Sequence, residues 1–299
     1  MAQPVTIESD ALRATVWPQF GGKVSSVIDK ADGYELLFNY PAVLPTGPQY
    51  DLPYGKGWYA GWDECFPGVA PGKYVGHPYD GIAVPDHGEL WGVPTTSVPA
   101  KNGITTVWHG LRFGYRLTRK LSLEGPSLTA EYTLVNLAPF EFRFVWAQHA
   151  LLAMEGPVEL SVRQNRLRLS HDARGNDIQR PFDWDSSEGD MGLLDHPSMM
   201  PAGNGWKIFS LDPISTPVTV HYPRRPHVRK LHISYASEAG MPAYWGIWIN
   251  TGGWAGHRHL ALEPPTGRFD ALDRSVQDDS AGRVGPLGRC DWSVRWDVA

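Results

Sequence analysis

The sequence predicts a single, nearly all-β domain, and three observations lead to this fold class. Short apolar or alternating runs recur about ten times along the 299 residues. The 32 glycines and 26 prolines supply turns at short intervals, as a chain of many short strands requires. No long segment places apolar residues at helical spacing. About ten strands in one domain require two packed sheets or a barrel.

The predicted strands are apolar or alternating runs, most of them with Gly, Pro, Asn or Asp nearby. They cover residues 11–17, 111–117, 128–135, 142–147, 158–169, 218–221, 230–235, 244–249, 259–262 and 292–298. Two long stretches, 40–80 and 171–205, lack a strand pattern, and long loops inside a domain are often functional. No linker interrupts the chain, so residues 1–299 are expected to form one domain.

The charge balance and the termini exclude several classes of protein. The net charge is -5, with 27 basic and 32 acidic residues and no basic run, which argues against a nucleic-acid partner. We find neither a signal peptide nor an apolar run near the ~20 residues that span a membrane. We therefore expect a soluble cytoplasmic protein. Two cysteines, Cys65 and Cys290, do not indicate a disulfide scaffold in a chain this long.

The strand predicted over 244–249 has two different faces. Because side chains alternate along a strand, Trp245, Ile247 and Ile249 share one face, which has the character of a core. Trp248 and Asn250 lie on the other face, which is aromatic and polar, as a ligand-binding surface would be.

The next predicted strand repeats this division. Leu260 and Leu262 fall on one face, whereas His257, His259 and Glu263 fall on the other. Pro264 and Pro265 then end the strand. A carboxylate beyond two histidines at a strand end is a candidate catalytic position, and a solvent-facing Glu with two surface histidines is the structural alternative.

Four further stretches follow one another with a characteristic order and spacing. They are 12–29 with 34–38, Gly-Trp-Asp-Glu-Cys-Phe-Pro at 61–67, Pro-Asp-His-Gly-Glu-Leu-Trp at 85–91, and Leu-Ala-Leu-Glu-Pro-Pro-Thr-Gly at 260–267. Together they resemble the aldose 1-epimerase (galactose mutarotase-like) superfamily from about Leu12 to the C-terminus. The resemblance implies a large antiparallel β-supersandwich with a sugar in a cleft on one sheet. It also implies interconversion of the α and β anomers of a free sugar, with no cofactor and no metal.

Anomer exchange needs a base for the anomeric hydroxyl and an acid for the ring oxygen. By resemblance, Glu263 is the base and His149, in the stretch 146–154, is the acid. His87 matches the family's first histidine and would hold the ring oxygen or a neighbouring hydroxyl. An imidazole suits the acid because its ordinary pKa, ~6.5, lies near working pH. Each residue also has a structural explanation: His87 could mark a turn, His149 a satisfied core position and Glu263 a surface position.

The sequence departs from common mutarotases in its predicted sugar contacts. The family's substrate-binding arginine has no counterpart upstream of His87, where Asp63 and Glu64 stand instead and could accept hydrogen bonds from sugar hydroxyls. Flat apolar rings can stack on a sugar, although core filling is the commoner role of a tryptophan. Among the 13 tryptophans, the candidates for stacking are Trp62, Trp91, Trp248 and Trp254.

Three alternatives remain open at this point. A non-catalytic carbohydrate-binding protein could use the same fold and tryptophans, because a fold does not determine a function. A cupin-type metal enzyme could use His257, His259 and Glu263, although no later histidine completes that motif. A phosphosugar epimerase would need converging cations, for which the adjacent pair Arg224 and Arg225 is weak support.

Overall fold

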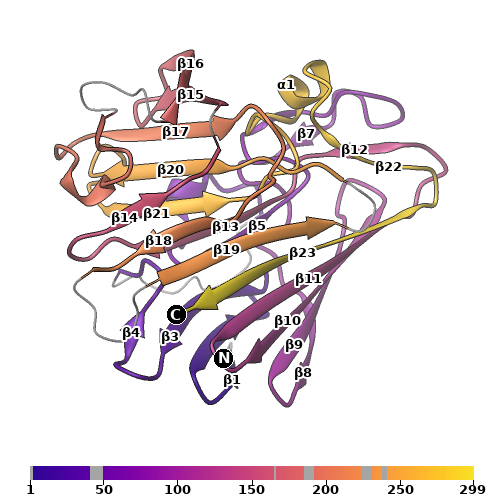
Figure 1. The fold of residues 1–299 in the computed structure, drawn as a ribbon. Coiled ribbons are helices and arrows are strands. Elements are labelled where there is room, and N and C mark those ends of the chain that lie inside the picture. The colour runs from indigo at the N-terminus through magenta and orange to yellow at the C-terminus, as the bar shows by residue number, and fades with distance from the viewer. Residues whose placement is uncertain (1–2, 41–49, 165, 185–191, 224–229, 238–240) are drawn as a thin grey trace.

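Two antiparallel sheets packed face to face make up most of the molecule (Figure 1). The computed structural model describes residues 3–40, 50–164, 166–184, 192–223, 230–237 and 241–299. The all-β sandwich expected from the sequence is confirmed. Within the described residues, no helix is both long and apolar enough to cross a bilayer.

The larger sheet has eleven strands, ordered β1-β2-β3-β5-β13-β21-β20-β17-β15-β16, with β4 paired to β3. Their bounds are β1 Val5–Glu8, β2 Leu12–Trp17, β3 Lys23–Asp29, β4 Tyr34–Glu35, β5 Trp62–Cys65, β13 Ala147–Ala153, β15 Arg166–Asp172, β16 Asp177–Asp183, β17 Gly205–Ser210, β20 Gly246–Thr251 and β21 Arg258–Glu263.

The second sheet has eight strands, ordered β14-β18-β19-β23-β11-β10-β9-β8. Their bounds are β8 Thr96–Ala100, β9 Gly103–His109, β10 Tyr115–Glu124, β11 Ser127–Asn136, β14 Glu159–Ser161, β18 Val218–His221, β19 Lys230–Ser237 and β23 Arg289–Val298.

Short elements connect and flank the two sheets. Two small ribbons pair β6 (Gly72–Lys73) with β7 (Ala83–Val84) and β12 (Phe142–Phe144) with β22 (Gly282–Val284). The helical elements that lie wholly within described residues include the 3₁₀ turns η1 (Tyr54–Lys56) and η4 (Pro197–Met199) and the short helix α1 (Leu272–Gln277).

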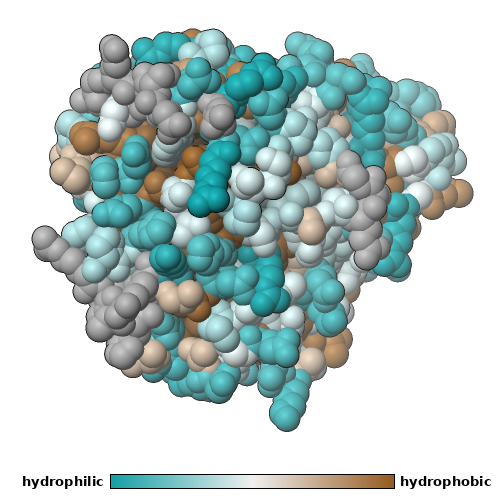
Figure 2. Space-filling view, viewed as in Figure 1, coloured by the Kyte–Doolittle hydropathy of each residue, from teal (hydrophilic) through white to brown (hydrophobic). Residues whose placement is uncertain are grey.

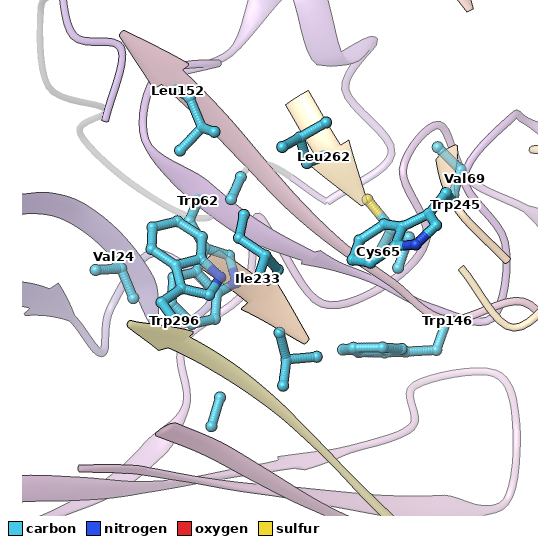
Figure 3. Packing of buried hydrophobic residues seen from close by; sticks show 14 of the residues in the cluster. Val24, Trp62, Cys65, Val69, Trp146, Leu152, Ile233, Trp245, Leu262 and Trp296 are labelled. Atoms are coloured by element: carbon cyan, nitrogen blue, oxygen red, sulfur yellow. The ribbon is translucent and has the colours of Figure 1, made fainter. Parts of the chain in front are cut away.

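The core lies between the two sheets, and strand alternation decides which side chains enter it. Trp245, Ile247 and Leu262 are fully buried there, as the predicted faces of β20 and β21 require. Figure 3 shows the indoles of Trp62 and Trp296 lying against each other, with ring centroids 5.4 Å apart. Polar residues cover most of the face in Figure 2, and apolar residues appear there in small separate groups.

Several predicted strand boundaries are wrong. Strand β10 begins at Tyr115 rather than at 111, because residues 111–114 form a bend in which Leu111 is exposed. The run 142–147 divides between β12 and β13, and the run 158–169 divides between β14 and β15, which belong to different sheets. The two stretches without a strand pattern contain β5 and β16. Strands β9 and β17 also escaped prediction.

Candidate functional site

A cavity of about 410 Å³ lies on the face of the larger sheet that points away from the core. Strands β13, β15, β17, β20 and β21 form its floor, and the segments 54–55, 69–71, 86–87 and 269–271 contribute to its walls. This volume falls within the range typical of small-molecule sites. The larger sheet therefore offers a binding site built mainly on strands.

The strand register brings His149 and Glu263 together. Leu151 of β13 pairs with Ala261 of β21. His149 comes two residues before Leu151 and Glu263 two residues after Ala261, so in this antiparallel pair they lie opposite each other on the same face. All four side chains point away from the core residues Leu260 and Leu262. His149 Nε2 lies 3.8 Å from Glu263 Oε1.

Glu263 is fully buried, yet within the described part of the chain only one of its carboxylate oxygens has a hydrogen-bond partner. Lys207 Nζ, from β17, donates to Oε2 at 2.6 Å and also lies 3.3 Å from Asp270 Oδ1. Oε1 has no hydrogen-bond partner among the described residues. A buried polar atom without a partner is costly, so Oε1 is a position where a ligand hydroxyl would be stabilising.

Burial and the ammonium of Lys207 act on Glu263 in opposite directions. Burial raises the pKa of Glu263 and is the larger effect, whereas Lys207 favours the charged carboxylate. Burial also opposes the charged form of Lys207, but the carboxylates of Asp270 and Glu263 outweigh it and raise the pKa of Lys207. Lys207 is therefore a permanent cation beside a carboxyl group with an elevated pKa, as a general base at neutral pH requires.

His149 contacts a buried chain of polar groups on its other side. Its Nδ1 lies 3.3 Å from the Tyr54 hydroxyl, which donates to Asp63 Oδ2 at 2.9 Å. Lys23 Nζ, which also donates to Ala60, reaches the same oxygen at 2.5 Å. Burial, followed by the charges of His87 and Lys207, lowers the pKa of His149 well below its ordinary value, so its imidazole is neutral.

His87 completes the group on a tight turn. Its backbone has φ 59°, in the left-handed region, and the next residue, Gly88, also has a positive φ. The ring stacks on Tyr54 with centroids 3.7 Å apart, and its centroid lies 4.8 Å from that of His149. Nδ1 lies 2.8 Å from Asp86 Oδ1. His87, His149 and Glu263 therefore line one cavity, whereas the sequence could only place them far apart along the chain.

Two of the predicted stacking residues line the cavity. Trp248 and Trp254 both contribute to its wall and are half-buried. Trp248 Nε1 donates to His259 Nε2 at 3.1 Å. Burial lowers the pKa of His259 to about 3, so this imidazole is neutral and carries its proton on Nδ1.

The predictions for Trp62 and Glu64 are wrong, because both side chains point into the core. Glu64 Oε1 accepts from Trp62, Arg119 and Tyr132 at 2.9–3.0 Å, and Oε2 accepts from Trp146 at 2.9 Å. Adjacent residues of a strand face opposite sides, so only one of Asp63 and Glu64 could approach the cavity. Recognising 62–65 as a strand would have excluded the pair.

Asp63 and Trp91 lie behind the cavity wall rather than in it. Asp63 reaches the cavity only through the hydroxyl of Tyr54. Trp91 packs edge-to-face on Tyr54 with centroids 5.1 Å apart and donates from Nε1 to the Asp86 carbonyl. Both residues contact Tyr54 from behind. They therefore support Tyr54 instead of making the direct sugar contacts predicted for them.

The three residues of the cupin alternative bind different neighbours. His257 Nε2 contacts the Tyr59 hydroxyl at 3.0 Å, while Glu263 binds Lys207 and His259 binds Trp248. Across the part of the chain that the structure describes, no three His, Cys, Asp or Glu side chains are arranged to hold a metal. Arg224 and Arg225 lie outside the described residues.

Three residues of the site were missed in the sequence. Tyr54 begins the 3₁₀ turn η1, Asp270 lies between β21 and α1, and Lys207 lies on β17. Lys207 alternates with Trp206 and Ile208, which is the signal that could have identified this strand and its polar face. Tyr54 carried no signal beyond its place in a long segment expected to be functional.

The comparisons with known proteins rest on structure. No protein-family model and no curated protein matches the sequence. The Slr1438 protein of Synechocystis sp. PCC 6803 matches with a TM-score of 0.74 at 16% identity, over 100% of this chain and 96% of that one. A proposed aldose 1-epimerase from Escherichia coli K12 matches with a TM-score of 0.71 at 14% identity, over 100% and 99%.

A galactose mutarotase-like protein from Lactobacillus casei ATCC 334 gives a similar result. Its TM-score is 0.70 at 15% identity, over 99% of this chain and 100% of that one. These likenesses cover both chains almost completely and concern the fold. The chain therefore has the galactose mutarotase-like β-sandwich fold, in a divergent sequence.

Proposed function

We propose that the protein is an aldose 1-epimerase-like isomerase that exchanges the anomers of a free sugar or a close derivative by acid–base ring opening. The observation that carries this proposal is the buried Glu263 carboxylate, whose Oε1 lies 3.8 Å from His149 Nε2 in the cavity and accepts no hydrogen bond from any residue that the structure describes. The Escherichia coli protein is described as a proposed aldose 1-epimerase and the Lactobacillus casei protein as galactose mutarotase-like, which supports the same chemistry.

The proposed reaction needs no cofactor or metal. Glu263 takes the proton of the anomeric hydroxyl while an imidazole, His87 or His149, gives a proton to the ring oxygen as its bond to the anomeric carbon breaks. In the open-chain form, rotation about the bond between the aldehyde carbon and the next carbon turns the aldehyde. The reverse proton transfers then close the ring on the other face of the aldehyde. Trp248 and Trp254 offer apolar faces for the C–H side of the sugar.

Anomer exchange across a panel of free aldoses, measured by NMR, tests the proposal. Wild-type protein should accelerate exchange for at least one sugar that it binds. Binding without acceleration would favour the second candidate, a non-catalytic carbohydrate-binding protein that uses the same aromatic wall. The absence of both binding and acceleration across the panel would contradict both functions for free aldoses.

A further inference from the structure

The hydroxyl of Tyr54 determines which nitrogen of His149 carries the proton. Its hydroxyl lies between Asp63 Oδ2, at 2.9 Å, and His149 Nδ1, at 3.3 Å, and all three side chains are buried. A phenol has one proton to donate. Because that proton goes to Asp63, the Tyr54 oxygen can only accept a hydrogen bond from His149.

Asp63 keeps the role of acceptor in either state of its ion pair. Lys23 Nζ lies against the same Oδ2, and burial raises the pKa of Asp63 against the opposing charge of Lys23. Whether the shared proton resides on Lys23 or on Asp63, it lies between those two atoms. It is therefore not available to reverse the bond from Tyr54.

The spacing between His149 Nε2 and Glu263 Oε1 in the cavity agrees with a proton on Nδ1 of His149. A neutral imidazole that donates from Nδ1 has a bare lone pair on Nε2. The 3.8 Å separation from Glu263 Oε1 is too long for a hydrogen bond, and Oε1 has no partner among the described residues. Two acceptors facing each other would take up such a spacing, because neither has a proton to share.

We infer that Tyr54 and Asp63 are positioning residues that hold His149 as its Nδ1–H tautomer, so that His149 accepts a substrate hydroxyl and His87 is the acid. This assignment exchanges the two histidine roles implied by the family resemblance. Its catalytic part rests on the proposed function, whereas the tautomer does not.

His87 has the arrangement that an acid requires. Its Nδ1 donates to Asp86 Oδ1 at 2.8 Å, and Asp86 remains a carboxylate because the bond and charge of His87 outweigh burial and lower its pKa. Nε2 is then the nitrogen left for a substrate. In the imidazolium form it transfers its proton to the ring oxygen while Glu263 takes the proton of the anomeric hydroxyl. Ring closure returns both protons, so the cycle balances.

Nitrogen-15 NMR of the imidazole rings tests the tautomer directly. The wild-type spectrum at neutral pH is compared with that of His149→Asn, which identifies the His149 signals by their loss. We expect a pyridine-like Nε2 and a pyrrole-like Nδ1. A protonated Nε2, in either a neutral or a doubly protonated ring, would overturn the inference without any use of activity data.

Tyr54→Phe tests whether Tyr54 holds His149 in its Nδ1–H tautomer. The variant keeps the ring that stacks on His87 and removes the acceptor at Nδ1, so the population should shift toward a protonated Nε2 next to Glu263. Tyr59→Phe is the matched control, since its hydroxyl contacts His257 instead. An unchanged His149 spectrum in Tyr54→Phe, or an equal change in Tyr59→Phe, would exclude Tyr54 as the positioning residue.

The catalytic part has a separate measurement. In anomer exchange, His87→Gln should lower kcat by about 100-fold or more, whereas His149→Gln should act mainly on KM. The reverse pattern would restore His149 as the acid. If the wild-type protein exchanges no sugar, the proposed function fails, and the tautomer still stands or falls by the spectrum alone.

Discussion

Among single residues, Lys207 has the most direct effect on the chemistry of Glu263. Its ammonium lies 2.6 Å from Oε2, and the side chain is itself buried. An opposite charge at this distance favours the ionised carboxylate and so lowers the pKa of Glu263 against the effect of burial. Without it, the burial that already raises the pKa of Glu263 would lose its strongest opponent.

Lys207→Met should therefore move the acid limb of the pH profile. A base works only when ionised, so a higher pKa of Glu263 shifts the acid limb of kcat/KM to higher pH. Lys207→Arg keeps the charge and should keep most of the limb's position. Lys120→Met, an exposed lysine paired with Glu131, is the control. An acid limb that stays in place in Lys207→Met would show that Lys207 does not tune this carboxyl.

On the scale of elements, strand alternation explains which site residues were predictable. The faces of β20 and β21 were correctly assigned because each strand carries core residues on one side and polar residues on the other. Strand β13 is buried on both faces, so its sequence shows no alternation that places His149. Strand β5 is short and carries two acidic residues, so the sequence of residues 40–80 shows no strand pattern there.

The turn that carries His87 depends on the missing side chain of Gly88. A Cβ at Gly88 would lie 2.1 Å from the Phe66 carbonyl oxygen, and its φ is +77°. Backbone atoms of Phe66 also pair with Gly88 in an isolated bridge, so they cannot retreat without breaking it. The turn therefore tolerates only glycine.

Gly88→Ala should lower both stability and activity. Left-handed backbone alone costs an alanine about 1–2 kcal/mol, and the contact with Phe66 should add about 2 kcal/mol or more. Gly33→Ala is the control, with φ +74° and no atom within 4 Å. Urea unfolding of both variants separates strain from collision, and equal losses would contradict the predicted collision.

Across the whole molecule, a buried ion pair joins the two sheets. Glu64 of β5 in the larger sheet binds Arg119 of β10 in the second sheet at 2.9 Å, with both side chains fully buried. Removing one partner of a buried pair leaves the other charge uncompensated. Glu64, which the sequence analysis assigned to sugar binding, therefore links the two layers of the sandwich through Arg119.

Glu64→Gln should destabilise the fold by about 3 kcal/mol or more. The amide nitrogen of the introduced glutamine would also face one of the N–H or O–H groups that now donate to the carboxylate. Glu131→Gln removes an exposed pair and should cost less than about 1 kcal/mol. Denaturant unfolding measures both, and a similar small loss in each would show that the pair contributes little.

The fold as a whole was more predictable from sequence than the site. Glycine and proline punctuation and strand periodicity are local, and they led to the all-β class. The site depends on which strands become neighbours: β13 brings His149 between Asp63 of β5 and Glu263 of β21. That order is set by long-range packing, so only the resemblance could connect these residues in the sequence.

The most direct test of the proposed chemistry is NMR anomer exchange with Glu263→Gln, with sugar binding measured on the same samples. Losing the base should slow exchange by about 100-fold or more, while binding persists. Glu35→Gln is the control, because this half-buried carboxyl binds Ser26 and backbone amides away from the cavity. Exchange at the wild-type rate in Glu263→Gln would contradict the assignment of Glu263 as the base.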